Sequence, residues 1–146
     1  MTGEAFGLVG GAVRAVFTKP FGLGTSSSAE LLIAPQDLYT ADPTIAIDIQ
    51  AGRFVLAGRS VELNGESPFQ TVPPSDAWVK DLHSFEWLRH LRVNETTIAQ
   101  LRARALIEDW IKYKSVHGAI PRDPTVTARR VIAWLCHSPL VLQDCD

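Results

Sequence analysis

The sequence has few of the residues that mark several large classes of protein. It contains one methionine and two cysteines, Cys136 and Cys145, among 146 residues, which is too few cysteines for a disulfide framework. We interpret both as free thiols. No run approaches the ~18–20 consecutive apolar residues of a membrane-spanning helix. The first 17 residues lack the basic start and small-residue cleavage site of a secretory signal, so no export signal is expected.

An excess of charge of either sign is also missing. The 14 lysines and arginines nearly balance the 16 aspartates and glutamates, for a formal net charge of −2. This balance argues against a dedicated binder of nucleic acid or of anionic membranes. The hydrophobic share of 46% and the charged share of 21% are typical of a globular chain. We therefore predict a folded domain that has neither nucleic acid nor membrane as its partner.

The first third of the chain has little regular pattern. Residues 1–41 are interrupted by glycine, serine and proline and predict an irregular lead-in to a domain at 42–146. Pro35 and Pro43 favour extended segments and turns over a long helix in residues 31–50. Residues 52–65 then place β-branched and aromatic residues in two runs around Gly58 and end on a turn pair. This pattern predicts a small β-hairpin with a buried face of Phe54, Leu56, Val61 and Leu63.

The second half of the chain predicts three helices, at residues 76–92, 95–114 and 124–137. Ser75 is a good N-cap for the first, and Asp123-Pro124 is an N-cap followed by proline at the first helical position. Apolar residues recur at helical spacing in the first helix (Trp78, Leu82, Phe85, Leu88, Leu91) and in the second (Ile98, Leu101, Ala105, Leu106, Trp110, Ile111). The fold class is therefore mainly α with a small hairpin.

The sequence offers no convincing catalytic or metal-binding group. Asp81 and Glu86 are five positions apart, so they do not share a helix face, and the spacing of seven between His83 and His90 does not suit a metal pair. Nucleophile elbows and phosphate-binding loops are absent as well, and no cofactor is expected. One polar cluster remains (Glu86, Arg89, His90, Arg92, Arg129, Arg130). It is either the solvated side of two helices or a basic rim that binds a carboxylate-bearing ligand.

Several segments resemble one known family. Residues 84–91 (SFEWLRHL), 103–111 with its Asp-Trp-Ile ending and 123–135 (DPTVTARRVIAWL) resemble successive helices of heparinase II/III-like polysaccharide lyases. Residues 52–58, 67–69 and 74–78 resemble the lead-in of the alphaproteobacterial type. The resemblance covers residues 42–142 and lies in the order and spacing of these segments, since no single motif is diagnostic.

The resemblance implies both a fold and a function. Family members have an (α/α) toroid followed by a β-sandwich and cleave uronic-acid-containing polysaccharides by β-elimination. The chain would then be the N-terminal fragment of a bacterial lyase, with residues 42–146 beginning an incomplete toroid and an acidic polysaccharide as the partner of the full-length parent. Glu86, Arg89 and His90 match a family motif and would line the toroid interior or the substrate cleft.

The same resemblance predicts that the chain alone is inactive. The family's Asn-His pair is missing, and the tyrosines Tyr39 and Tyr113 match none of its motifs, so no catalytic residue can be carried over. An alternative is a non-catalytic helical module for binding or interaction, which uses an exposed apolar helix face and the arginine rim. A third hypothesis is a helical domain of unrelated function. An unfinished toroid would also self-associate through its exposed helix faces.

Overall fold

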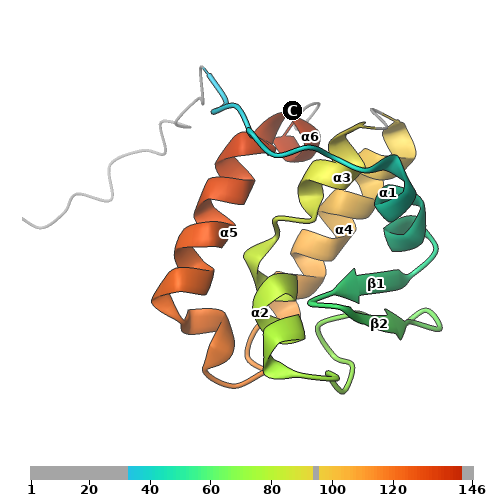
Figure 1. Ribbon diagram of the computed structural model, residues 1–146, viewed down its shortest axis with the longest axis vertical. Coiled ribbons are helices and arrows are strands. Elements are labelled where there is room, and N and C mark those ends of the chain that lie inside the picture. The colour runs from blue at the N-terminus through green and yellow to red at the C-terminus, as the bar shows by residue number, and fades with distance from the viewer. Residues whose placement is uncertain (1–32, 94–95, 143–146) are drawn as a thin grey trace, which may run out of the picture. The chain divides into compact units, whose positions relative to one another are not determined.

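The computed structural model describes residues 33–93 and 96–142, and these residues are mainly helical (Figure 1). The predicted combination of helices with one small hairpin is confirmed. Most of the predicted lead-in, residues 1–32, lies outside the described residues, as does Cys145. The elements in chain order are α1 (Pro43–Gln50), β1 (Arg53–Leu56), β2 (Arg59–Glu62), α2 (Asp76–Ser84), α3 (Leu88–Val93), α4 (Thr97–Tyr113), the 3-10 turn η1 (Ile120–Arg122), α5 (Pro124–Cys136) and α6 (Ser138–Leu142).

Side-chain caps begin the longer helices. Ser75 Oγ accepts a hydrogen bond from the backbone N–H of Trp78 at 3.2 Å, and Asp123 Oδ1 accepts one from Thr125 at 2.8 Å. Both caps were predicted from the sequence. Each satisfies a backbone donor that the helix itself leaves unpaired, which is worth about 1 kcal/mol per cap.

Helix α1, of eight residues, was not predicted, since residues 31–50 were expected to favour extended segments and turns over a long helix. Asp42 Oδ1 accepts from the backbone N–H of Thr44 at 2.8 Å, and Pro43 occupies the first turn. Proline disrupts a helix interior but suits this position, where its missing N–H would have no helical partner. Ala46 and Ile49 are the buried residues of this helix.

The hairpin is present as predicted. Strands β1 and β2 are antiparallel, and Phe54 pairs with Val61. The turn is formed by Ala57 and Gly58, both with positive φ, as the tight turns that match strand twist require. Phe54 is fully buried, while the other three predicted residues pack half-buried against the core (Leu56, Val61, Leu63).

The single helix predicted for residues 76–92 is interrupted. Phe85 adopts a left-handed conformation with φ 60° and separates α2 from α3. This conformation costs roughly 1–2 kcal/mol for a residue other than glycine. It carries the Phe85 ring into the core, where it lies 5.1 Å from Trp87 and 5.3 Å from Trp134, measured between ring centroids. Burial of the ring offsets the backbone strain.

The core is built around aromatic rings from every part of the described chain. Trp78 and Trp87 are buried, and the half-buried rings of Trp110 and Trp134 meet edge to face at 5.1 Å. Helix α2 packs against α5, while α3 packs against α1 and α4; Figure 1 shows α5 beside α2 and the hairpin on the other side. All four tryptophans therefore find aromatic or backbone partners within the described residues.

Helix α4 buries a different face from the one predicted. Its buried residues are Ala99, Ala103 and Leu106, of which only Leu106 belongs to the predicted stripe. Small side chains allow the neighbouring helices to approach closely. As a result, three large residues of the predicted stripe are exposed (Ile98, Leu101, Ile111).

Candidate interaction surface

Helix α5 has one buried side and one exposed apolar side. Val126, Arg130 and Ala133 are buried on the side that faces α2. Four apolar residues on the other side are exposed, with Ile132 at 62% of its maximal accessible area. We call these residues the α5 face (Ala128, Val131, Ile132, Leu135). Their spacing of three, four and seven positions makes one continuous stripe along a helix.

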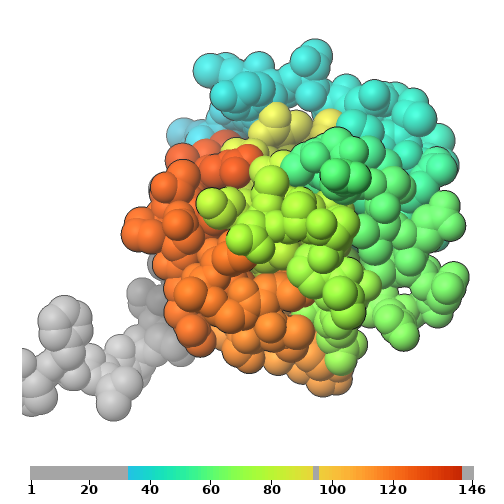
Figure 2. All heavy atoms as spheres, turned by 60° about the horizontal axis from the view of Figure 1, so that its bottom comes forward, coloured from blue at the N-terminus to red at the C-terminus, as the bar shows by residue number. Residues whose placement is uncertain are grey.

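The α5 face carries no charge. Between Pro124 and Leu142 the only residues of Asp, Glu, Lys or Arg type are Arg129 and Arg130, and both are turned toward α2. Arg129 Nη2 lies 3.1 Å from Asp81 Oδ1 and 2.5 Å from Glu86 Oε2. Arg130 donates to the carbonyl oxygens of His83 and Pro121. Figure 2 shows the orange atoms around α5 at the margin of the described part, beside α2 in yellow-green.

A basic cleft lies where α4 ends and α5 begins. Its volume is about 470 Å³, within the ~300–1,000 Å³ of typical ligand pockets. Arg130 Cζ lies 4.5 Å from the centroid of the Trp110 ring, and Lys114 Nζ lies 5.3 Å from it. No carboxylate is among the lining residues (Trp110, Ile111, Lys112, Lys114, Ser115, Pro121, Arg122, Thr127, Arg130). Thr127 and Arg130 of the cleft belong to α5, the helix that also carries the α5 face.

A chain of hydrogen bonds holds Trp110 in the cleft wall. The indole N–H of Trp110 donates to His83 Nδ1 at 3.0 Å. Because that nitrogen accepts, the proton of the neutral ring is on His83 Nε2, which donates to His117 Nδ1 at 2.9 Å. His117 Nε2 then donates to the carbonyl oxygen of Thr71 at 3.2 Å.

Burial keeps the central histidine of this chain neutral. His83 is fully buried, and its pKa is lowered to about 3, first because burial disfavours the charged ring and then because His117 and Arg130 are nearby. Burial is also the main cause that lowers the pKa of His90 and of His137. The arrangement is a rigid scaffold for Trp110 rather than a proton carrier near neutral pH.

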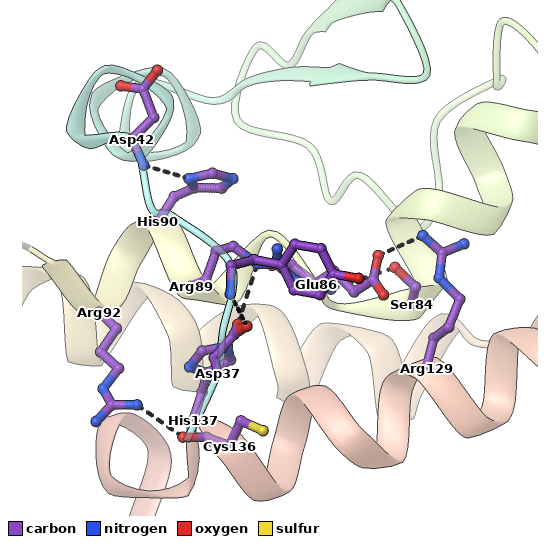
Figure 3. A network of polar contacts seen from close by, with 11 residues as sticks. Asp37, Asp42, Ser84, Glu86, Arg89, His90, Arg92, Arg129, Cys136 and His137 are labelled. Carbon is purple, nitrogen blue, oxygen red and sulfur yellow. Dashed lines mark hydrogen bonds and ion pairs between the residues drawn. The ribbon is translucent and has the colours of Figure 1, made fainter. Parts of the chain in front are cut away.

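The structure brings together the three residues that the sequence singled out. Glu86, Arg89 and His90 line one shallow pocket of about 200 Å³. Each has an intramolecular partner (Figure 3). Glu86 pairs with Arg129, Arg89 Nε lies 3.3 Å from Asp37 Oδ2, and His90 Nδ1 accepts from the backbone N–H of Asp42 at 2.9 Å. A ligand-binding role for these three residues stays a prediction.

The other arginines of the predicted rim also bond within the chain. Arg92 Nη1 donates to the carbonyl oxygen of Cys136 at 3.0 Å, which joins α3 to the end of α5 (Figure 3). His137 Nε2 lies 3.0 Å from Asp37 Oδ2, so the segment before α1 is held from two sides. Three exposed cations that the predicted rim did not include line the basic cleft (Lys112, Lys114, Arg122). Their only sequence signal was the cluster of lysines that ends α4.

The described residues contain no cluster of three histidine, cysteine, aspartate or glutamate side chains suited to a metal ion. Within 33–93 and 96–142, no helix has the length and apolar character needed to cross a membrane. Cys136 is a buried thiol.

Comparison with known proteins changes the interpretation of the sequence. No protein-family model matches the chain, and no solved structure matches it. The chain is similar to FtsZ-localized protein C of Caulobacter vibrioides (strain NA1000 / CB15N), with 32% identity over 103 residues. The match covers 70% of this chain and 18% of that protein, so the chain spans less than a fifth of the length of its relative.

These findings contradict the resemblance to heparinase II/III-like lyases. The named relative is an FtsZ-localized protein, and nothing in the comparisons points to a lyase. The predictions of a polysaccharide lyase fragment, of a role in carbohydrate metabolism and of an acidic polysaccharide partner are therefore wrong. The segments that suggested them are short amphipathic pieces with common helix-forming residues, and such pieces recur in unrelated helices.

Proposed function

We propose that this chain is a non-catalytic helical module that binds FtsZ in cell-division assemblies. The observation that carries the proposal is the α5 face, which is apolar, uncharged and exposed on a helix whose other side is buried. The similarity to an FtsZ-localized protein supplies the cellular setting. It also favours a protein partner over a polysaccharide.

The α5 face has the properties of an interface centre. Charged residues are depleted at the centres of protein interfaces, and apolar residues supply most of the binding free energy there. Removing the exposed parts of Val131, Ile132 and Leu135 from water would contribute roughly 1–2 kcal/mol each. Because α5 is capped by Asp123 and tied to α2 through Arg129 and Arg130, the face is already ordered. Binding then needs little further loss of conformational entropy.

The charge pattern of α5 favours a protein over a lipid surface. Helices that lie on membranes place lysine and arginine around their apolar face, where they attract anionic lipid. On α5, Arg129 is paired with Asp81 and Glu86, and Arg130 is only 7% exposed. The face therefore offers apolar contact without a flanking cation of its own.

A binding experiment with matched variants tests the proposal. Fluorescently labelled chain is titrated with purified FtsZ, and the dissociation constant is read from anisotropy. Ile132→Asp combined with Leu135→Asp should weaken binding by at least about tenfold, or ~1.4 kcal/mol. The control is Ile98→Asp with Leu101→Asp, which changes an exposed isoleucine and leucine at the same spacing on α4. Circular dichroism of each variant establishes that it is folded.

Either of two results would contradict the proposal. One is equal weakening by both pairs of substitutions, which would mean that the loss is not specific to α5. The other is an unchanged dissociation constant for the α5 pair. A fluorescent fusion that stays diffuse in cells whose FtsZ is assembled would remove the cellular part of the proposal.

We also keep the finer architecture expected from the sequence as a proposal. In it, residues 42–146 begin an (α/α) toroid, supported by the packing of α2 on α5 and of α3 on α4. Glu86, Arg89 and His90 would then line its inner side, where Arg89 and His90 contact Asp37 and Asp42. In a toroid a further helix would cover the α5 face. Labelling of position 132 from solvent, in a longer protein that contains this region and with no partner present, separates a free α5 face from a covered one. A further helix of the toroid would block the labelling, whereas a free face would be labelled.

A further inference from the structure

The basic cleft holds positive charge that the described chain does not neutralise. None of the ion pairs between described residues includes Lys112, Lys114, Arg122 or Arg130. The whole chain is slightly acidic, with a net charge of −2, so this local excess is a property of the cleft. Arg130 is 7% exposed and bonds to carbonyl oxygens and to the hydroxyl of Thr127. Its charge thus faces the cleft without a carboxylate partner.

Part of the cleft wall is apolar and is formed by Trp110, Ile111 and Pro121. Trp110 is fixed by its bond to His83, and two cations stack on its ring. Cation–π contacts of this kind orient side chains without neutralising them. Among the lining residues, Ile111 is exposed and Pro121 is buried. The cleft therefore combines exposed cations with apolar surface.

We propose that the basic cleft binds an acidic segment of the protein partner, with aspartate or glutamate side chains against Lys114 and Arg122. This inference rests on the proposed function and specifies the chemistry of the partner. An arginine fork matches a carboxylate in shape and charge. A peptide that leaves the cleft along α5 would place its apolar residues on the α5 face.

The shape of the charged area favours a peptide over nucleic acid. Nucleic-acid binders present a basic stripe that follows a phosphate backbone. Here three exposed cations, Lys112, Lys114 and Arg122, line one cleft, and the α5 face is uncharged. An acidic segment that also carries apolar residues matches both parts of the surface.

Peptide probes test this inference without FtsZ. The first probe is a labelled peptide of about twelve residues that alternates glutamate with leucine, and the second replaces each glutamate with glutamine. The intact chain should bind the glutamate peptide at least about tenfold more tightly than the glutamine peptide. Because the contacts are partly exposed, rising salt should weaken this preference. An oligothymidylate of similar length is the third probe.

Charge-reversed variants locate the binding site. Lys114→Glu with Arg122→Glu should weaken binding of the glutamate peptide by at least about tenfold. The control, Arg59→Glu with Lys80→Glu, makes the same change in net charge at exposed cations outside the cleft and should leave binding within about threefold. Equal losses in both variants, no preference for glutamate over glutamine, or tighter binding of oligothymidylate than of the glutamate peptide would each overturn the inference.

The two proposals fail in distinguishable ways. The α5 substitutions Ile132→Asp and Leu135→Asp should weaken binding of FtsZ by at least about tenfold, while the cleft still discriminates the glutamate probe from the glutamine probe. If the cleft variant binds FtsZ as the unaltered chain does and the α5 variant does not, the inference about the cleft is wrong and the proposed function stands. If FtsZ does not bind but the chain still prefers the glutamate peptide, the proposed function is wrong. The cleft then binds an acidic segment of a different protein.

Discussion

The left-handed conformation of Phe85 leads to an unusual prediction about glycine. Replacing Phe85 with alanine removes a fully buried ring that contacts four other aromatic side chains (Phe69, Trp87, Trp110, Trp134). Truncation of a buried phenylalanine costs roughly 3–5 kcal/mol. Glycine removes the same ring and also relieves the strain of the positive φ, 60°.

The magnitude follows from two opposing effects. A left-handed backbone costs alanine roughly 1–2 kcal/mol that glycine avoids. Against this, glycine makes the unfolded chain more flexible than alanine does. The larger entropy lost on folding lowers the stability of the glycine variant by roughly 0.4–1 kcal/mol relative to the alanine variant. The difference leaves Phe85→Gly more stable than Phe85→Ala by about 0.5–1 kcal/mol. At Leu91, which is buried and lies inside helix α3, the order should be reversed, with glycine below alanine by about 1 kcal/mol.

Urea denaturation followed by circular dichroism at helical wavelengths measures both pairs of variants. This signal avoids tryptophan fluorescence, which would change when the ring beside Trp87 and Trp134 is removed. If the folded fraction of a Phe85 variant is too small for a baseline, trimethylamine oxide restores it equally for alanine and glycine. A Phe85→Ala variant that equals or exceeds Phe85→Gly in stability would refute the reasoning, since no strain would then be present at this position.

Three further predictions concern pH, a tight turn and a helix cap. The pKa of His83 in the folded chain is about 3, below the ordinary value near 6.5. The contribution of neutral His83 to the free energy of unfolding is therefore complete above pH ~6.5 and declines as the pH falls toward 3. About 2 kcal/mol of it is lost by pH ~5. Urea titrations at about pH 5 and above pH ~6.5 compare His83→Asn with the unaltered chain. The variant should lose about 2 kcal/mol less stability between the two pH values. An identical pH dependence of the two chains would contradict the lowered pKa of His83. Gly52→Ala should lower the free energy of unfolding by about 1–3 kcal/mol, because Gly52 has φ +85° and a Cβ there would lie 3.0 Å from the carbonyl oxygen of Leu63. Gly118 has φ +65° with open space around it, so Gly118→Ala should show only the cost of the backbone strain. Thermal melts measure both variants. Asp123→Ala should lower the unfolding free energy by about 1 kcal/mol, measured by urea denaturation, and no change would mean that water caps α5 equally well.

Local sequence patterns predicted local structure well where their cause is local. The caps at Ser75 and Asp123 and the hairpin around Gly58 depend on residues within a few positions of one another. Asp42-Pro43 carries the same helix-start signal as Asp123-Pro124, yet the proline was interpreted as a helix breaker. The signal for α1 was therefore present, and the position of proline within the first turn was the deciding fact.

The errors in the helical half arise from packing between distant segments. Nothing in residues 76–92 marks Phe85 as a break, because the cause is an aromatic pocket formed by residues as far away as Trp134. On α4, the larger Ile98 and Leu101 looked like the buried stripe, whereas the fold buries Ala99 and Ala103. Hydrophobicity alone favours the larger residues, and only the approach of neighbouring helices selects the small ones.

The candidate sites depend on packing in the same way. Arg89 and His90 lie in α3, whereas Glu86 lies in the turn between α2 and α3, so their meeting in one pocket depends on the break at Phe85 that the sequence did not predict. The basic cleft joins residues from α4, η1 and α5, and no spacing rule brings Lys114, Arg122 and Arg130 together. No apolar stripe was predicted for the third helix, and which side of α5 is exposed depends on its packing against α2.

Footprinting of the α5 face tests the central claim most directly. Ile132→Cys and Ile98→Cys place a thiol at two exposed positions, one on the α5 face and one on α4, and the rate of maleimide labelling is measured with and without saturating FtsZ. The account predicts that FtsZ slows labelling at position 132 by at least about fivefold, since an interface centre excludes solvent, and leaves position 98 unchanged. Unchanged labelling at position 132 under conditions where FtsZ is bound would show that the partner docks elsewhere, and the proposed interface would be wrong.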